Sequence, residues 1–312
     1  MEKYYKIIDS DEKGKFDAHR FLKYIRRSND RWWSDDRRDS PWVFRGVCNS
    51  KYKLLPAAWR KEKNPLESII KEINDNLTAK SVGGWMDSLY GREACIWANA
   101  ESEAIHQFSQ LAINLGHKLD DPGYSPLKVG RLKVPAANII IINTNLENAK
   151  LAQHHGIPTR LLDWTNNPIF AAFFAAANRF REDKTSDICI WACRIGNVLG
   201  HSSDVPQYRN ILRIHNQPGH KNQYLQAQQG LFFEITKAEE FYSLNGYWPA
   251  LDDLLTNQHI QKPDEDIMLK ITLSSEHVPI LLTLLDREGI NEAALLPSMD
   301  NVARTILDRW TN

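Results

Sequence analysis

Apolar residues recur at helical spacing in several segments of the chain. They predict helices over Phe16–Arg27, Glu67–Ala79, Glu101–Asn114, Asn138–Ala149, Asn167–Phe180, Val278–Leu285 and Val302–Trp310. The Asn167–Phe180 helix has a clear start, because Asn167 can cap it and Pro168 suits its first position. The same pattern places phenylalanines four residues apart, so we expect this helix to be buried on most sides.

Shorter runs rich in β-branched and aromatic residues predict strands. These runs are Trp42–Cys48, Ile188–Cys193, Leu231–Thr236 and Ile267–Leu273, with a further short one at Ala293–Leu296. Together the two patterns predict an α+β fold, a single domain with a mixed or antiparallel sheet. We expect an N-terminal helical extension over residues 1–40 and a main domain over 41–312, with a helical insert at about 61–148.

Composition narrows the classes of protein. The formal net charge is zero, so there is no global attraction to nucleic acid or to an anionic membrane. A local cluster of Arg20, Lys23, Arg26 and Arg27 either contacts phosphates or forms a solvated helix face. The four cysteines show no CxxC pairing and are expected to be buried thiols. No apolar run is long enough to span a bilayer, and we expect a cytoplasmic protein.

The segment Ala152–Thr165 sets reactive and charged groups among apolar residues, as a pocket wall would. His154 and His155 are neighbours and point in different directions. Each is either a hydrogen-bonded structural histidine or a general base or hydrogen-bond donor to a substrate. Arg160 and Asp163 either form a structural ion pair or contact a ligand. Because no HExxH or paired CxxC pattern occurs, no metal site is expected.

Directly after the segment's aspartate, Trp164 and Thr165 offer an aromatic wall and a hydroxyl. Much earlier in the chain, Phe44 is followed by Arg45 and Gly46. Arg45 either pairs with a buried carboxylate or binds an anionic ligand, most naturally a diphosphate. Gly46 allows backbone or ligand to approach closely.

Three later residues are further candidates. Gln228 and Gln229 precede a predicted strand and can fix a substrate hydroxyl or amide. Glu292 is either a catalytic carboxylate or an exposed turn residue. The P-loop, Rossmann and nucleophile-elbow signatures are missing from the sequence, which argues against kinases, P-loop proteins, Rossmann enzymes and serine hydrolases.

Five stretches in this order resemble the FRG domain, named for its Phe-Arg-Gly motif. They are WVFRG, YKLLPAAWR, AQHHGIPTRLLDWTNNPIFAAFFA, AQQGLFFEI and GINEAALLP, and they cover roughly residues 40–305. A more distant resemblance connects the chain with the arginine–serine–glutamate class of ADP-ribosyltransferases. Arg45 is similar to the arginine of that class, Asp163-Trp164-Thr165 to its second element with one hydroxyl retained, and Glu292 imperfectly to its glutamate.

The distant resemblance implies an ADP-ribosyltransferase-like fold and an NAD-dependent mono-ADP-ribosyltransferase, acting as a toxin or antiphage effector on a protein or nucleic acid, with an antitoxin or regulatory partner. NAD, or another phosphorylated nucleotide, would contact Phe44, Arg45, Gly46, Arg160, Asp163, Trp164, Thr165, Gln228 and Gln229. Glu292, His154 and His155 would be catalytic. Two alternatives remain: a non-enzymatic module that senses a nucleotide or phage component, and a hydrolase or nuclease using His154, His155 and Asp163.

Overall fold

The computed structural model describes residues 5–8, 17–34, 38–62, 64–78, 91–123, 125, 146–182, 185–196, 212–216, 230–257 and 268–311. Contacts within the chain divide it into two compact units. Unit 1 comprises residues 1–53, 163–233 and 252–312, and unit 2 comprises residues 54–162 and 234–251. The predicted division into an N-terminal extension and a main domain stays a prediction.

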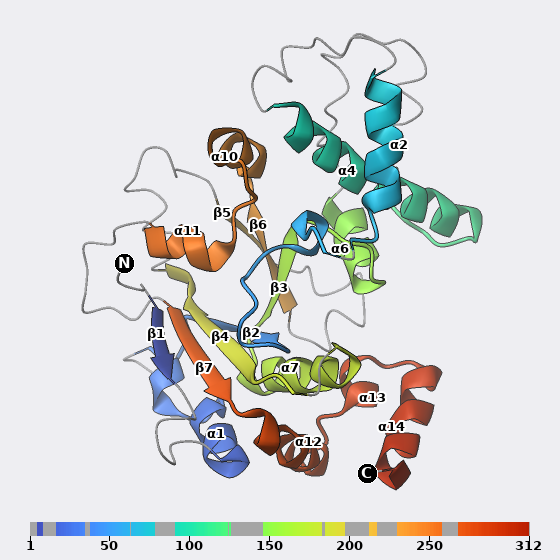
Figure 1. Cartoon of the computed structure of the whole chain (residues 1–312). Coiled ribbons are helices and arrows are strands. Elements are labelled where there is room, and N and C mark those ends of the chain that lie inside the picture. Colours follow the sequence, from blue (N-terminus) through green and yellow to red (C-terminus); the bar gives the residue numbers. More distant parts are fainter. Residues whose placement is uncertain are drawn as a thin grey trace. The chain divides into compact units, whose positions relative to one another are not determined.

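A mixed sheet is the framework of unit 1, with the strand order β1-β7-β4-β2-β3-β6-β5 (Figure 1). The strands are β1 (Tyr5–Ile8), β2 (Trp42–Val47), β3 (Leu161–Thr165), β4 (Ile188–Arg194), β5 (Leu212–Asn216), β6 (Gly230–Ile235) and β7 (Met268–Leu273). β1 runs parallel to β7, whereas β7–β4, β4–β2 and β2–β3 are antiparallel pairs. The chain passes from one unit to the other within β3 and within β6. The predicted α+β class with a mixed sheet is confirmed, while the ADP-ribosyltransferase-like fold stays a prediction.

Strand β2 is paired on both edges, and its alternate residues face opposite sides of the sheet. Phe44 lies on one side in the core and is 1% exposed. Gly46 lies on the same side, where a Cβ atom would sit 1.9 Å from the carbonyl oxygen of Ala171. Only glycine at position 46 therefore lets the helix that carries Ala171 pack this closely on β2. The expected close approach of backbone to Gly46 is confirmed. Arg45 lies on the opposite side.

Three helices pack with this sheet through one apolar cluster. They are α1 (Ala18–Ile25), α7 (Pro168–Glu182) and α12 (Val278–Arg287), and Figure 1 shows them below the sheet. Asp17 caps α1 by accepting a hydrogen bond from the Arg20 amide at 2.8 Å. The predicted start of α7 is confirmed, because the Ile169 amide donates to Asn167 Oδ1 at 3.0 Å.

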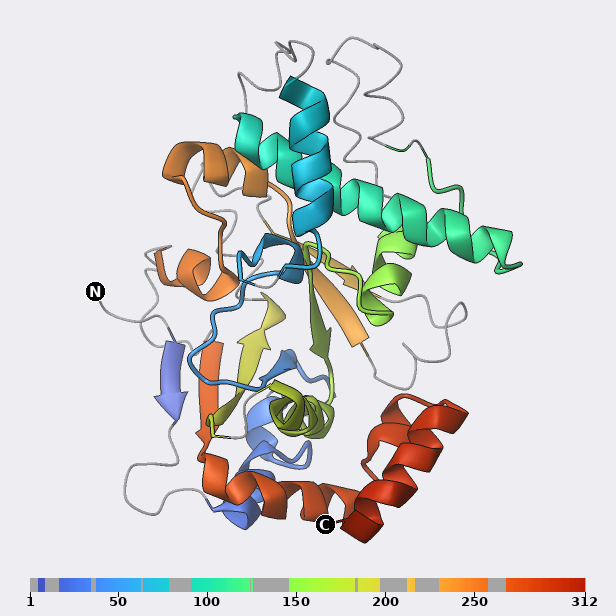
Figure 2. The ribbon, with the colours of Figure 1, turned by 45° about the vertical axis from the view of Figure 1, so that its right-hand side comes forward.

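The predicted strand at Ala293–Leu296 is wrong. Residues Glu292–Leu295 form the short helix α13, which is followed by α14 (Met299–Thr311) (Figure 2). The Asn291 side chain caps α13 by accepting from the Ala294 amide at 3.1 Å. Four apolar residues are too few for periodicity to separate strand from helix, and the asparagine cap decides between them.

Unit 2 is mainly helical. Its helices are α2 (Glu67–Thr78), α4 (Arg92–Asn114), α6 (Leu146–His154) and α10 (Ala238–Asn245), with a 3₁₀ turn at Ala57–Trp59. α2 packs on α4 around Ile73, Ile96 and Ala100 (Figure 2). α4 begins at Arg92, nine residues before the predicted start at Glu101. The prediction missed this first part because its buried residues are mostly small, and alanines give a weak apolar signal.

The remaining elements are short. They are the helix α11 (Leu251–Asn257) and the 3₁₀ turns η1 (Asp30–Trp32) and η5 (Ser275–His277). Within the described parts of the chain, no helix combines the length and the apolar character that a bilayer crossing requires.

Candidate functional site

Arg45 and Asp163 come together on neighbouring strands of unit 1. The pairing of Phe44 with Thr165 brings the two residues within reach. Arg45 Nη1 donates to the backbone carbonyl oxygen of Asp163 at 2.6 Å and lies 3.5 Å from Asp163 Oδ2. The Arg45 side chain is 17% exposed and that of Asp163 is 59% exposed. A hydrogen bond to the backbone therefore fixes the Arg45 guanidinium, and the Asp163 carboxylate beside it is exposed to solvent.

The neighbouring aromatic residues of both strands are buried. Phe44 meets the ring of Trp32 edge-on at 4.9 Å, and Trp164, 2% exposed, stacks on Phe233 at 4.8 Å. Thr165 is buried as well, and its Oγ1 accepts from the Asn167 amide at 3.1 Å. Neither ring presents the open face that an aromatic wall of a ligand site requires. In this structure these residues hold β2, β3 and the start of α7 in place.

The face of the sheet that carries Arg45 also carries a second cation. Arg45 is opposite Trp191 on β4, and Trp191 is opposite Lys270 on β7. Lys270 Nζ lies 5.2 Å from the centre of the Trp191 ring, within cation–π range. Two positive groups thus lie two strands apart on one face, with a buried indole between them.

The cysteines on this face are inert. Cys189 and Cys193 are free and buried, as are Cys48 and Cys95, which confirms the expected buried thiols. Burial raises the pKa of Cys189 to about 12, although Lys270 acts in the opposite direction. Burial also raises the pKa of Cys193. Neither thiol forms the thiolate that a nucleophile needs near neutral pH.

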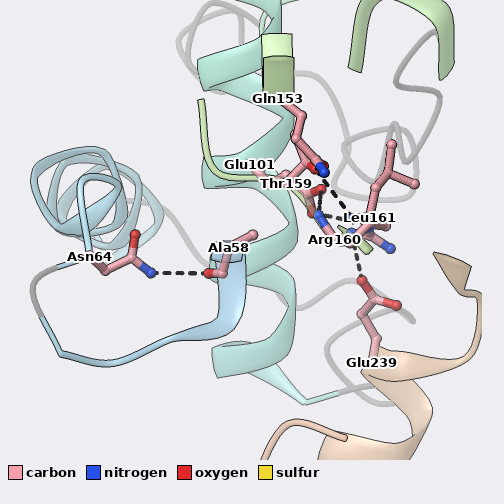
Figure 3. Close-up of polar contacts among 8 residues, drawn as sticks. All are labelled: Ala58, Asn64, Glu101, Gln153, Thr159, Arg160, Leu161 and Glu239. Carbon is pink, nitrogen blue, oxygen red and sulfur yellow. Dashed lines mark hydrogen bonds and ion pairs between the residues drawn. The ribbon is translucent and has the colours of Figure 1, made fainter. Parts of the chain in front are cut away.

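Arg160 lies at the centre of a buried ion network in unit 2 (Figure 3). Glu101 accepts from the Arg160 amide at 2.6 Å and from Arg160 Nε at 2.9 Å, through different carboxylate oxygens. Arg160 Nη2 also lies 2.9 Å from Glu239 Oε1, in an ion pair without hydrogen-bond alignment. The three side chains are 7%, 2% and 5% exposed. Arg160 and Asp163 therefore do not pair with each other, because Arg160 pairs with Glu101 and Glu239 while Asp163 pairs with Arg45.

Two carboxylates, Glu101 and Glu239, face one cation in this network. Desolvation raises the pKa of Glu101, and the attraction of Arg160 only partly offsets it. Burial alone would lower the pKa of Arg160, but the fields of Glu101 and Glu239 outweigh it and raise the pKa. Arg160 therefore stays charged, and burial makes Glu101 easier to protonate than an exposed glutamate.

The turn before Arg160 is held by further hydrogen bonds (Figure 3). Thr159 Oγ1 donates to Gln153 Oε1 and accepts from the Leu161 amide at 3.2 Å. The Ala58 amide donates to the Thr159 carbonyl at 3.1 Å. Trp59 lies 5.9 Å from the guanidinium of Arg160. The network therefore fixes the segment that leads into β3 and has the character of a structural centre.

His154 ends α6 and His155 follows it in unit 2. The two rings meet edge-on at 5.2 Å, and His155 stacks on Phe108 at 5.8 Å. His155 is exposed and His154 is half-buried. A general-base role for either one stays a prediction. The residues that the structure describes contain no group of three His, Cys, Asp or Glu side chains that could hold a metal ion.

Glu292, the catalytic candidate, lies in unit 1 at the first position of α13. Its Oε1 accepts from Arg304 Nη1 of α14 at 2.9 Å. The Glu292 side chain is 13% exposed and that of Arg304 is 51% exposed. The Glu292 carboxylate is therefore paired with a cation. It begins a helix and not a strand. Gln228 and Gln229 lie outside the described residues.

Glu101 and Glu239, the two carboxylates that pair with Arg160, were not among the site residues expected from the sequence. Glu101 had a recognisable signal, because it lies three residues after Ala98 and four before Ile105, on the buried side of α4. A charged residue on the apolar side of a helix needs a buried partner. Glu239 has no comparable pattern around it.

Comparison with protein families finds the FRG domain at residues 40–184. The matched region contains the Phe44–Gly46 motif and the segment from Ala152 to Thr165, but it ends before the two later stretches that also resemble the family. Comparisons with curated proteins and with solved structures find no match. None of these comparisons bears on the more distant resemblance to ADP-ribosyltransferases. The match over residues 40–184 supports the assignment of the chain to the FRG family.

Proposed function

We propose that the chain is an NAD-dependent mono-ADP-ribosyltransferase-like enzyme, a toxin or antiphage effector, in which Arg45 binds the diphosphate. The observation that carries the proposal is the direct pairing of β2 with β3. It joins β2, which contains Arg45 and Gly46, to β3, which bears Asp163, and α7 begins three residues after β3 ends. These are two of the three elements that the resemblance to this enzyme class requires.

The proposed role of Arg45 follows from its two contacts. The bond to the Asp163 carbonyl keeps the guanidinium in one orientation, while the carboxylate contact at 3.5 Å is longer than an ideal ion pair. A phosphate oxygen can replace that carboxylate without moving the arginine. Lys270, two strands away on the same face, adds to the positive potential there.

The proposed reaction breaks the glycosidic C–N bond of NAD. Nicotinamide leaves with the bonding electrons, and an acceptor nucleophile bonds to the ribose carbon and gives up a proton. A carboxylate stabilises the positive charge that develops on the ribose, and Glu292 is the candidate for this role. Its ion pair with Arg304 must lengthen for the carboxylate to act.

The test uses NAD labelled in its adenylate phosphate, a cell lysate as the source of acceptors, and a separate assay for nicotinamide release. The intact chain should transfer label and release nicotinamide. In Arg45→Gln, the NAD concentration that gives half of the full thermal stabilisation should rise at least tenfold. This corresponds to the loss of about one charge-assisted hydrogen bond. Arg287→Gln, which removes an exposed arginine from α12, is the matched control.

Glu292→Gln should keep NAD binding and lose turnover. The proposal is contradicted if the intact chain neither consumes NAD nor transfers label under these conditions.

A second candidate is a non-enzymatic module that senses a phosphorylated nucleotide. One observation favours it: Glu292 begins a helix and is paired with Arg304, unlike the strand-borne glutamate of the enzyme class. This candidate predicts that NAD raises the thermal midpoint of the chain while no nicotinamide is released. It also predicts that Glu292→Gln changes nothing.

A further inference from the structure

Five exposed cations gather in residues 17–34 of unit 1, on α1 and in the turn after it. They are Arg20, Lys23, Arg26, Arg27 and Arg31. The same stretch contains two carboxylates, Asp17 and Asp30. Because the whole chain has a formal net charge of zero, these residues form a local excess of positive charge. We call the exposed side of residues 17–34 the α1 surface.

The apolar side of α1 is already occupied. Phe21, Leu22 and Ile25 are buried in the core beneath the sheet. Within residues 17–34, no large hydrophobic side chain is exposed. A helix that inserts into a membrane needs a free apolar face, so the α1 surface suits a polyanion in water better than a lipid surface.

Aromatic rings hold two of these arginines. The guanidinium carbon of Arg31 lies 4.4 Å from the centre of the Tyr24 ring and 5.4 Å from that of Trp32. The guanidinium of Arg27 lies 5.5 Å from Trp33, whose Nε1 donates to the Arg27 carbonyl at 2.7 Å. A guanidinium stacked in this way loses less side-chain entropy when it binds a phosphate.

Two nearby carboxylates, those of Asp17 and Glu288, already make defined contacts. The Asp17 carboxylate caps α1, and the hydrogen bond from the Arg20 amide lowers its pKa. Glu288, next to the end of α12, forms an ion pair with Arg26. The segments on either side, residues 9–16 and 35–37, carry charges of both signs and lie outside the described residues, so the inference concerns the α1 surface alone.

We propose that the α1 surface binds the phosphate backbone of a nucleic acid. Arg20 and Lys23 are three residues apart on α1, so they lie on one side of the helix, about 4.5 Å apart along its axis, and can contact neighbouring phosphates of one strand. Because the proposed contacts join side chains only to phosphates, binding should depend little on base sequence and strongly on salt concentration. The inference concerns binding alone and does not depend on the proposed NAD chemistry.

The test measures fluorescence anisotropy of a labelled single-stranded oligonucleotide with the full chain, without NAD, between about 50 and 200 mM salt. The variant Arg20→Gln/Lys23→Gln/Arg27→Gln should bind at least tenfold more weakly. Its slope of log K against log salt should be shallower by about 2, since each single-strand phosphate contact contributes about 0.7. The control Lys51→Gln/Lys71→Gln/Lys118→Gln removes the same charge from exposed positions outside the α1 surface.

The control should bind within about twofold of the unchanged chain, because long-range charge effects are screened at these salt concentrations. Thermal unfolding of both variants shows whether the fold is retained. The proposal is overturned if the unchanged chain does not bind at low salt, or if the control loses as much affinity as the α1 variant. Binding of phosphatidylserine vesicles instead of the oligonucleotide, with the same sensitivity to the α1 variant, overturns it in favour of a membrane.

Discussion

Arg45 donates from Nη1 to the backbone carbonyl oxygen of Asp163, 118 positions later in the chain, at 2.6 Å. The partner is a main-chain atom, so the position of the guanidinium does not depend on the Asp163 side chain. That side chain contributes a carboxylate at 3.5 Å, which is more than half exposed. The two contributions of Asp163 can therefore be separated by mutation.

The first prediction uses this separation. Asp163→Asn should leave Arg45 in place and remove the carboxylate that competes with a phosphate. Affinity for NAD should then rise by up to about fivefold, the upper range for an exposed ion pair. Isothermal titration or thermal shift would measure it, with Asp300→Asn on α14 as an exposed control. Weaker binding by Asp163→Asn would mean that Asp163 itself contacts the nucleotide.

The second prediction concerns Gly46. Gly46→Ala should cost about 3 kcal/mol of the free energy of unfolding, because its methyl group would overlap the Ala171 carbonyl of α7 at 1.9 Å. Gly196→Ala is the matched control, since a Cβ there meets nothing within 4 Å. Urea unfolding of both variants decides the point. Equal stability of the two would show that α7 can move away from β2 at little cost.

The third prediction concerns Arg160. Arg160→Met should destabilise the chain by about 3–5 kcal/mol, because it leaves the buried carboxylates of Glu101 and Glu239 without their cation. Arg304→Met removes an arginine from a half-exposed ion pair and should cost less than about 1 kcal/mol. Denaturant unfolding compares the two, and a similar small loss in both variants would argue against a buried network.

The fourth prediction concerns pH. Burial raises the pKa of Glu101 in the folded chain above its usual value of 4.5. A carboxyl group with a raised folded pKa contributes stability at low pH, and this contribution is lost as pH rises through the folded pKa. Glu101→Gln removes this group's titration. The stability of the unchanged chain relative to Glu101→Gln should therefore decline from pH 4.5 upward.

Unfolding free energies of both proteins, measured across pH 4.5 to about 8, would test this sign. Asp300→Asn serves here as a control for removing an exposed carboxylate. A difference that stays constant with pH, or that grows in favour of the unchanged chain, would show that Arg160 fully compensates Glu101.

Local patterns predicted most of the long elements. The apolar spacing of Glu67–Ala79 and the Asn167-Pro168 cap correspond to α2 and α7, and the β-branched run Ile188–Cys193 corresponds to β4. These signals lie within one element and do not depend on the rest of the chain. The prediction at Ala293–Leu296 was wrong because so short a run has no period, and only its cap at Asn291 specifies a helix.

The partners of the charged residues could not be predicted in the same way. Arg160 and Asp163 are three positions apart, yet Arg160 pairs with Glu101 and Glu239, and Asp163 pairs with Arg45. The sequence spacing of a charge does not specify which distant carboxylate or carbonyl will reach it. That choice depends on which strands are neighbours in the sheet and which helices lie beside the turn.

The sequence by itself determined the α+β class, most helices and strands, the resemblance to the FRG domain, and the expectation that Gly46 allows a close approach of backbone or ligand. Only the tertiary structure decided that the backbone of α7 is what approaches Gly46, that Phe44 and Trp164 are core residues, and that Glu292 begins a helix. The physical reason is that local propensity acts over a few residues, whereas burial and ion pairing join residues that are far apart in the chain.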